Sequence, residues 1–188
     1  MSVAGRGLTA DSQVLEPAER FPREGLATEA FAPDAFALLQ LERHLHQAIP
    51  LSRAMQASVL EAGEEHVLLG APLAPNVNHR GTVFGGSAVT LATLSAWTLL
   101  YWRLRMHLPP ASVVLQSSSM RYLRPISSAF AARATLRPDA SWPTFLRTLA
   151  RRGKARISVG AEVLDGVELA AEFLGEFVAL AEPGVPSP

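Results

Sequence analysis

The stretch from Gly85 to His107 constrains the fold more than any other part of the chain. It reads as one long helix whose apolar residues fall on nearly all faces. A helix that is apolar all round is stable in water only when it is buried, so other elements must wrap it. Its longest uncharged apolar run, Ala88 to Trp102, is too short to span a bilayer and carries several hydroxyl groups. We therefore expect this helix at the centre of a globular fold.

The segments on either side of this helix read mainly as strands. Apolar and polar residues alternate with a period of two, which is typical of antiparallel strands with one core face. The expected strands are 55–61, 66–73, 113–124, 130–137, 157–163 and 167–177. Asp165-Gly166 predicts a hairpin between the last two. The expected fold is α+β, an antiparallel sheet wrapped around one long central helix, and its open edges predict at least a dimer.

Two further helices and the domain limits follow from local signals. Apolar spacing predicts a helix over 35–47 that is stopped by Pro50. A short helix is expected after Ser141, with Ser141 as its cap and Pro143 in its first turn. Residues 1–33 mix Gly, Pro, Ser and charges without a period, so we expect a flexible tail, a domain over 34–182 and a short tail over 183–188.

Composition excludes several classes of function. The formal net charge is zero, which gives no global field for nucleic acid or an anionic membrane. The chain has no cysteine, so disulfides, thiolate metal sites and cysteine nucleophiles are excluded. His44 and His46 are two residues apart and face different ways on a helix, and no other cluster has metal spacing, so we expect no metal and no cofactor. The start, Met1 to Arg6, lacks the apolar core of a signal peptide, so the expected location is the cytoplasm.

A polar loop rich in glycine leads directly into the long helix. It reads Asn76-Val77-Asn78-His79-Arg80-Gly81-Thr82-Val83-Phe84-Gly85-Gly86-Ser87. The first amides of a helix have no intrahelical partner and carry the positive end of its dipole. Glycine lets a ligand oxygen approach the backbone closely. This loop is therefore a candidate site for polarising a carbonyl group.

This loop and the order of elements resemble the hot-dog fold of acyl-thioester enzymes. The phenylacetyl-CoA-thioesterase-like branch has Asn, two variable residues, Gly-Thr-apolar, His-Gly-Gly, and an acid seven positions later. Here the pattern maps onto Asn78, Gly81-Thr82-Val83, Phe84-Gly85-Gly86 and Thr93, so that Phe84 stands in place of the His and Thr93 in place of the acid. The chain is still more similar, over about 35–181, to the putative thioesterase family named for the YiiD carboxy-terminal domain. Further matches are Trp97, Tyr122-Leu123-Arg124-Pro125, 152–156 and 175–178.

The resemblance implies roles for individual residues. The candidates for catalysis are Asn78, His79, Gly86, Ser87 and Thr93. The amides of Gly86 and Ser87 would bind the thioester carbonyl, and Asn78, Thr93 or His79 would assist the attacking water. Each has a structural alternative: glycines allow tight packing, Asn78 can close an Asx turn, His79 can be an exposed loop residue, and Thr93 can bond a helix carbonyl. Ser87 lacks the Gly-x-Ser-x-Gly elbow of a serine nucleophile.

The candidates for substrate binding lie in the loop and in the basic half of the chain. They are Gly81, Thr82, Phe84, Gly85, Arg121 and Arg124. A wider basic group, which adds Arg147, Arg151, Arg152, Lys154 and Arg156, would contact coenzyme A phosphates or an acidic acyl carrier protein, or would simply form a solvated face. Trp97, Tyr101 and Trp102 are expected in the core or an interface, with an acyl tunnel as the alternative.

Three functions therefore stay open at the level of sequence. The first is an acyl-thioester hydrolase acting on acyl-CoA or acyl carrier protein, as a homodimer or homotetramer. The second is a non-catalytic acyl-CoA or acyl carrier protein binding module, which the substitutions Phe84 and Thr93 favour. The third is an acyl hydratase or dehydratase of the same fold, which requires a His and acid pair that is not found in the loop.

Overall fold

The computed structural model describes residues 34–107 and 111–182, so the two expected tails lie outside the described residues. The helices are α1 (Ala35–Ala48), α2 (Pro50–Ala54), the short 3-10 helix η2 (Ala74–Asn76), α3 (Gly85–His107) and α4 (Trp142–Arg152). The strands are β1 (Ser58–Ala62), β2 (His66–Ala71), β3 (Ala111–Tyr122), β4 (Phe130–Leu136), β5 (Lys154–Asp165) and β6 (Glu168–Ala181). In the described ranges, no helix is both long and apolar enough to cross a membrane.

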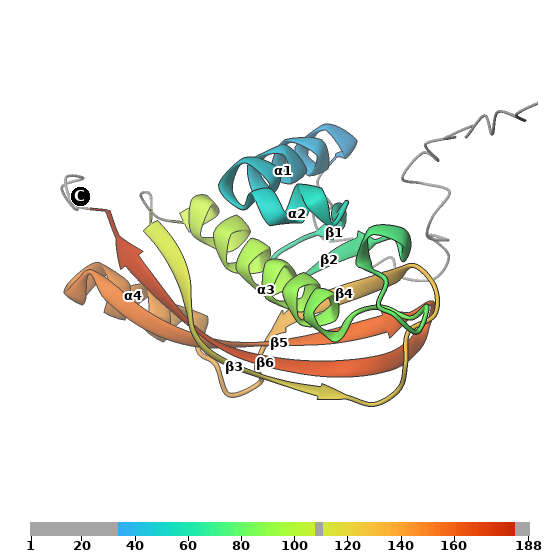
Figure 1. Ribbon diagram of the computed structural model, residues 1–188. Coiled ribbons are helices and arrows are strands. Elements are labelled where there is room, and N and C mark those ends of the chain that lie inside the picture. The colour runs from blue at the N-terminus through green and yellow to red at the C-terminus, as the bar shows by residue number, and fades with distance from the viewer. Residues whose placement is uncertain (1–33, 108–110, 183–188) are drawn as a thin grey trace, which may run out of the picture.

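The six strands form one antiparallel sheet in the order β1-β2-β4-β5-β6-β3. The sheet curves beneath α3, and α1 and α2 lie on the other side of that helix (Figure 1). This arrangement confirms the expected α+β fold with a sheet wrapped around one long helix. Because β1 and β3 are at the two ends of the order, each has an edge without a strand beside it.

Helix α3 has the predicted bounds and is the centre of the core. Leu91, Ala92, Ala96 and Leu99 are fully buried along it. Ser95 is also fully buried, and its hydroxyl lies 3.0 Å from the carbonyl oxygen of Val67 and 2.9 Å from that of Ala132. A buried hydroxyl needs an acceptor, and this one, placed between two carbonyls, ties the helix to β2 and β4.

The first expected strand starts later than the sequence predicts. Residues 55–57 are not part of a strand, because Pro50 does not simply end α1 but begins the short helix α2. Proline suits the first turn of a helix, whose first amides have no partner. Helix α2 is followed by Gln56, which has a φ of 55°, and β1 begins only at Ser58.

For the first residues of the last strand, the predicted alternation of core-facing and solvent-facing side chains is wrong. The alternation predicts Val167 on the core face, but this residue is 95% exposed in the turn that joins β5 and β6. The register changes between Val163 and Leu164, so that Ala170 lies in a bulge and is buried. A bulge adds one residue to one strand and reverses the alternation on its two sides. From Ala171 onward the expected core positions are buried.

Helix α4 confirms the prediction made from Ser141 and Pro143. The Ser141 hydroxyl accepts a hydrogen bond from the amide of Thr144, and Pro143 lies in the first turn. Gly153 ends the helix with a φ of 64°, a left-handed conformation that glycine adopts without strain. Trp142, Phe145 and Leu149 form its buried face.

An aromatic stack joins α1 to α3. The ring centroids of His44 and Tyr101 are 4.1 Å apart, and those of Tyr101 and Trp97 are 5.3 Å apart. The indole of Trp97 also donates to the carbonyl of Val113 on β3, at 3.1 Å. Burial, and secondly the charge of Arg105, lower the pKa of His44. These two effects favour the neutral imidazole.

We expect core truncation in α3 to be costly. Leu99→Ala removes a fully buried side chain and should lower the free energy of unfolding by about 2–5 kcal/mol. Leu39→Ala is the matched control, because Leu39 lies on a helix but is 51% exposed, and its cost should be below about 1 kcal/mol. Urea unfolding followed by circular dichroism measures both. Equal costs would contradict a core centred on α3.

Acid should weaken the contact between α1 and α3. A lowered pKa in the folded state means that the unfolded state binds the proton more readily, so stability falls as the pH drops below the ordinary histidine pKa of about 6.5. The melting temperature of the wild type should therefore fall more between pH 7.5 and pH 5.5 than that of His44→Gln. An unchanged pH dependence in this variant would show that His44 contributes nothing.

Candidate functional site

The loop before α3 is held in place by Asn76. This side chain is 2% exposed, and its amide group donates to the carbonyls of Met55, at 3.0 Å, and Pro72, at 2.8 Å. The backbone carbonyl of Asn76 accepts a hydrogen bond from the amide of Phe84, at 2.7 Å. Asn76 therefore fixes where the chain enters α3, which is a structural role.

Asn78 ties the loop together by a set of short-range hydrogen bonds. Its side-chain nitrogen donates to the Thr82 hydroxyl, at 2.9 Å, and to the carbonyl of Val83, at 3.2 Å. Its side-chain oxygen accepts from the amide of Arg80, at 2.8 Å. Gly81 completes the turn with a φ of 77°. Since both ends of its amide group are engaged, Asn78 shapes the loop in this structure, as the Asx-turn alternative expects.

The start of α3 leaves two backbone amides without an acceptor. The amide of Ser87 donates to the carbonyl of Phe84, at 2.9 Å, and that of Ala88 donates to the same oxygen, at 3.1 Å. Among the described residues, no group accepts from the amides of Gly85 or Gly86. The two amides at the positive end of the dipole are therefore those of Gly85 and Gly86, one residue earlier than the expected pair.

Phe84 and Gly86 are matched in shape. A Cβ atom added to Gly86 would lie too close to the Phe84 ring for any real contact, so the ring rests on the bare backbone of this glycine. Phe84 is 57% exposed, so the ring also presents an apolar surface to solvent beside the free amides. The aromatic side chain therefore occupies space at the helix start where the resemblance implies a histidine.

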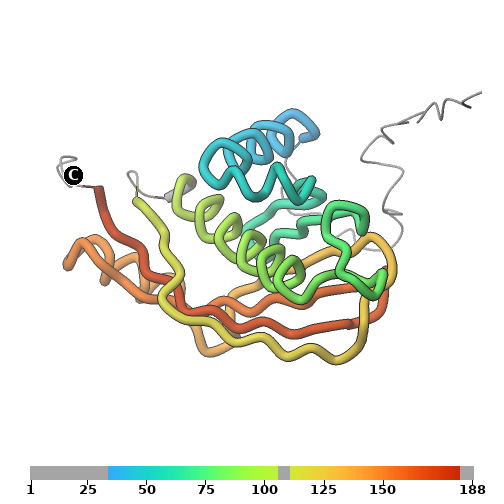
Figure 2. The backbone as a smooth tube through the Cα atoms, in the orientation of Figure 1, coloured from blue at the N-terminus to red at the C-terminus, as the bar shows by residue number. Residues whose placement is uncertain are grey.

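Tyr122 reaches the same point from the end of β3. Its hydroxyl donates to the carbonyl of Gly85, at 2.8 Å, and its ring lies against the face of Gly85. The amide of Val83 donates to the carbonyl of Ile126, at 2.8 Å, which joins the loop to the segment after β3. The tube in Figure 2 shows this loop beside the chain that leaves β3. Tyr122 is not among the site residues expected from the sequence, because its partner is 37 residues away.

A surface pocket of about 360 Å³ adjoins the helix start. It combines the loop, the first turns of α3 and the segment that follows β3. Its lining residues are Thr82, Val83, Gly85, Ala88, Tyr122, Leu123, Arg124, Pro125 and Ile126. Three of the candidate substrate-binding residues, Thr82, Gly85 and Arg124, therefore meet at one pocket.

The two candidate arginines lie in different places. Arg124 lines the pocket, but it forms ion pairs with Asp165, at 3.7 Å, and with Glu168. Arg121 precedes Tyr122 on β3 and pairs with Glu172 across the strands, at 3.7 Å. Because successive side chains of a strand point to opposite faces, Arg121 faces away from the side on which Tyr122 reaches α3.

Thr93 and His79 are not among the residues that line the pocket. The Thr93 hydroxyl donates to the carbonyl of Val89, at 2.9 Å, which is the helix back-bond considered as its alternative. His79 lies in the loop, and the part of the chain that the structure describes offers its side chain no hydrogen bond. In that same part, no three His, Asp or Glu side chains come together as a metal site would require.

Comparison with known proteins gives a family and a fold. The family model described as "Putative thioesterase (yiiD_Cterm)" matches residues 38–181. A solved structure of a putative thioesterase from Shewanella oneidensis is 29% identical with a TM-score of 0.69, and the match covers 78% of this chain and 99% of that one. A Pseudomonas aeruginosa protein described as a probable thioesterase is 20% identical with a TM-score of 0.64, covering 77% and 95%.

A third structure, a mutant of the phenylacetic acid degradation protein PaaI from Thermus thermophilus, is 24% identical with a TM-score of 0.52. That match covers 71% of this chain and 99% of the other. At such identities the second and third structures support the fold alone. The family model spans the whole sheet and all of α3, together with the loop, both free amides and the pocket. The chain therefore belongs to the family of putative thioesterases defined by the carboxy-terminal domain of YiiD, and it has the hot-dog fold.

Proposed function

We propose that this protein is an acyl-thioester hydrolase whose reaction takes place at the start of α3. The observation that carries the proposal is the pair of amides, of Gly85 and Gly86, that no described residue accepts from, at a helix start where Gly85 lines a pocket. Preorganised backbone donors of this kind stabilise an oxyanion by a few kcal/mol each. Family membership supports the same reaction class.

The proposed reaction needs only these donors, water and a base. Water gives one proton to the base as its oxygen adds to the thioester carbonyl carbon, and the two amides hold the negative charge that develops on the carbonyl oxygen. The intermediate then collapses, the carbon–sulfur bond breaks, and the thiolate leaves and takes up a proton. The products are a carboxylic acid and a free thiol.

A hydrolase needs a base to activate water, whereas a non-catalytic binding module does not. Asn78 and Thr93 are both engaged in hydrogen bonds within the chain, which leaves His79 or a group from a second copy to activate water. Strand β3 supports a second copy, because it is a twelve-residue edge strand with exposed Val114 and Leu115. Long apolar edges are normally paired, so we infer a dimer formed along β3.

A non-catalytic acyl-thioester binding module is the second candidate. The apolar Phe84 ring beside the free amides favours binding of an acyl thioester without a base to break it. Tight binding of acyl-CoA or acyl carrier protein with no turnover would support this module over the hydrolase.

Thioester hydrolysis should be directly measurable with the purified protein. We expect thiol release from at least one member of an acyl-CoA and acyl carrier protein panel of varied chain length. The chain has no cysteine, so a thiol reagent reports only the product. Absence of turnover across the whole panel would contradict the hydrolase.

The amide of Gly86 can be removed without removing a helical hydrogen bond. Gly86→Pro places proline at the second position of α3, as Pro143 is placed in α4. We expect kcat to fall by about 100-fold or more, because one oxyanion donor is lost. The matched control is Gly86→Ala, which adds the same Cβ against Phe84 but keeps the N–H. An equal loss in both variants would show that the displaced ring matters and the amide does not.

A further inference from the structure

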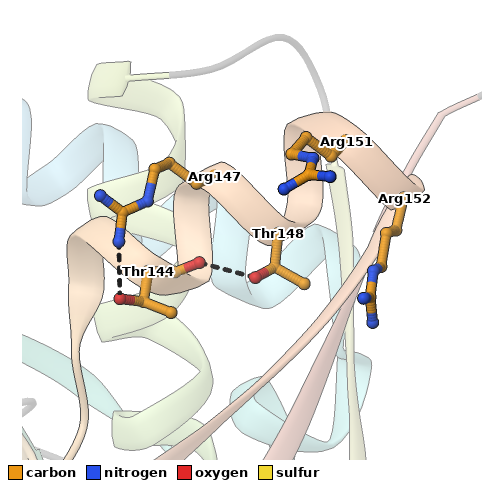
Figure 3. Close-up of a pocket in the computed structure, with 5 residues that line it drawn as sticks. All are labelled: Thr144, Arg147, Thr148, Arg151 and Arg152. Carbon is orange, nitrogen blue, oxygen red and sulfur yellow. Dashed lines mark hydrogen bonds between the residues drawn. The ribbon is translucent and has the colours of Figure 1, made fainter.

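Helix α4 presents a basic face that the proposed reaction does not use. Its members share the spacing of one helical stripe and line an open hollow of about 310 Å³. They are Thr144, Arg147, Thr148, Arg151 and Arg152, shown in Figure 3. We call these five residues the α4 face. All three of its arginines are exposed.

The charge of the chain is divided unevenly around this helix. Residues 140–156 hold five cationic side chains and no acidic one. The whole chain has 17 of each sign, so the rest of it has 12 cations against 17 acids. A net charge of zero therefore conceals a segment of +5 and a remainder of −5. Such a local field attracts an anionic partner over about a Debye length.

The arginines of the α4 face are free and partly preorganised. None of them pairs with an acid among the described residues. Arg147 donates to the Thr144 hydroxyl, at 3.0 Å, and this hydroxyl also accepts from that of Ser141, at 3.0 Å. One side of the Arg147 guanidinium is thereby fixed, while its other N–H groups remain available to an external acceptor.

A structural role explains only part of this charge. Arg151 and Arg152 are in the last turn of α4, where cations stabilise the helix dipole. Arg147 lies earlier in the helix, where this effect has faded. The apolar face of α4 is buried against the sheet, so the helix has no free apolar stripe to insert into a bilayer. Three guanidiniums spread over a helical stripe suit a row of carboxylates on another protein.

We propose that the α4 face docks an acidic carrier protein that presents the acyl thioester. This inference rests on the proposed function and names its substrate as a carrier-bound rather than a free thioester. Docking of this kind is electrostatic, so it raises the association rate and weakens with salt.

The position of α4 implies that the docked carrier serves the second copy. Arg103, near the end of α3, stacks on Trp142 of α4 at 4.3 Å, so α4 lies at the opposite end of α3 from Gly85 (Figure 1). A helix of 23 residues is about 35 Å long. The other end of the sheet register brings α4 close to β3. Lys154, which follows α4 and begins β5, pairs with Leu180 on β6, and Leu180 pairs with Ser112 near the start of β3.

Two-fold pairing along β3 is antiparallel, so the start of one β3 lies beside the end of the other. Tyr122, at the end of β3, is hydrogen-bonded to the Gly85 carbonyl of its own chain. The separation from β5 to the partner's β3 is then three strand spacings, about 14 Å. The α4 face of one copy is therefore much closer to the helix start of its partner than to its own.

Charge reversal on α4 tests the docking. We expect Arg147→Glu/Arg151→Glu to raise KM for an acyl carrier protein substrate by about tenfold or more, with kcat and the hydrolysis of acyl-CoA of the same acyl group unchanged. The control is Arg43→Glu/Arg53→Glu, which makes the same charge change at exposed positions on α1 and α2 and should leave both substrates unchanged. The thermal unfolding of each variant shows that it is folded.

The other outcomes are distinct. Equal losses on both substrates, or no loss on either, would overturn the docking and leave the hydrolase intact. Binding of the wild type to phosphatidylglycerol vesicles that is lost in the variant, with carrier binding unchanged, would assign the face to a membrane instead. If the wild type hydrolyses neither substrate, the proposed function fails, and fluorescence anisotropy with labelled acyl carrier protein still tests the docking.

Mixed dimers test whether the carrier serves the second copy. Gly86→Pro chains with an intact α4 face are unfolded and refolded together with Arg147→Glu/Arg151→Glu chains. Random pairing of equal amounts makes half of the dimers mixed. If docking and hydrolysis occur on different copies, each mixed dimer has one working site. Activity on the carrier substrate should then rise to about a quarter of the wild-type value. Activity no higher than the average of the two parent variants would overturn the arrangement between copies.

Discussion

The burial of α3 is the constraint on which the rest of the structure depends. The helix is apolar on nearly every side, so a single layer cannot shield it, and the curved sheet and α1 cover it from two directions. Ser95 shows how closely the layers meet, because its hydroxyl reaches carbonyls of both β2 and β4. Its hydrogen bonds offset the cost of removing this hydroxyl from water.

Burial of the helix also determines where chemistry can occur. The middle of α3 is mostly buried, whereas its first turn is partly exposed beside the loop at 76–84 and the end of β3. Asn76 anchors this loop to the core, and Tyr122 holds the first carbonyl of the helix from the sheet side. The free amides of Gly85 and Gly86 are thus fixed by contacts on both sides, which is the rigidity that a polarising site requires.

Strong local signals make much of this fold predictable. The bounds of α3 and the capped start of α4 follow from Gly85-Gly86 and from Ser141 with Pro143. Helix α2 and the turn at Val167 escape prediction, because Pro50 can end one helix or begin another and the bulge at Ala170 leaves no trace in the alternation. The loop is recognisable as a site, but the roles within it depend on hydrogen bonds, such as that of Tyr122, between residues far apart in sequence.

The site separates the two requirements of thioester hydrolysis. The polarising groups are backbone amides, which the helix supplies wherever its first turn is exposed, whatever the side chains beside them. The base must be a side chain, and here Phe84 and Thr93 stand where the related branch has His and an acid. The Phe84 ring needs the bare backbone of Gly86 to pack at all, so this pair forms one structural unit. In the proposed hydrolase this unit gives the acyl thioester an apolar surface beside the amides, and His79 or a group from a second copy activates water.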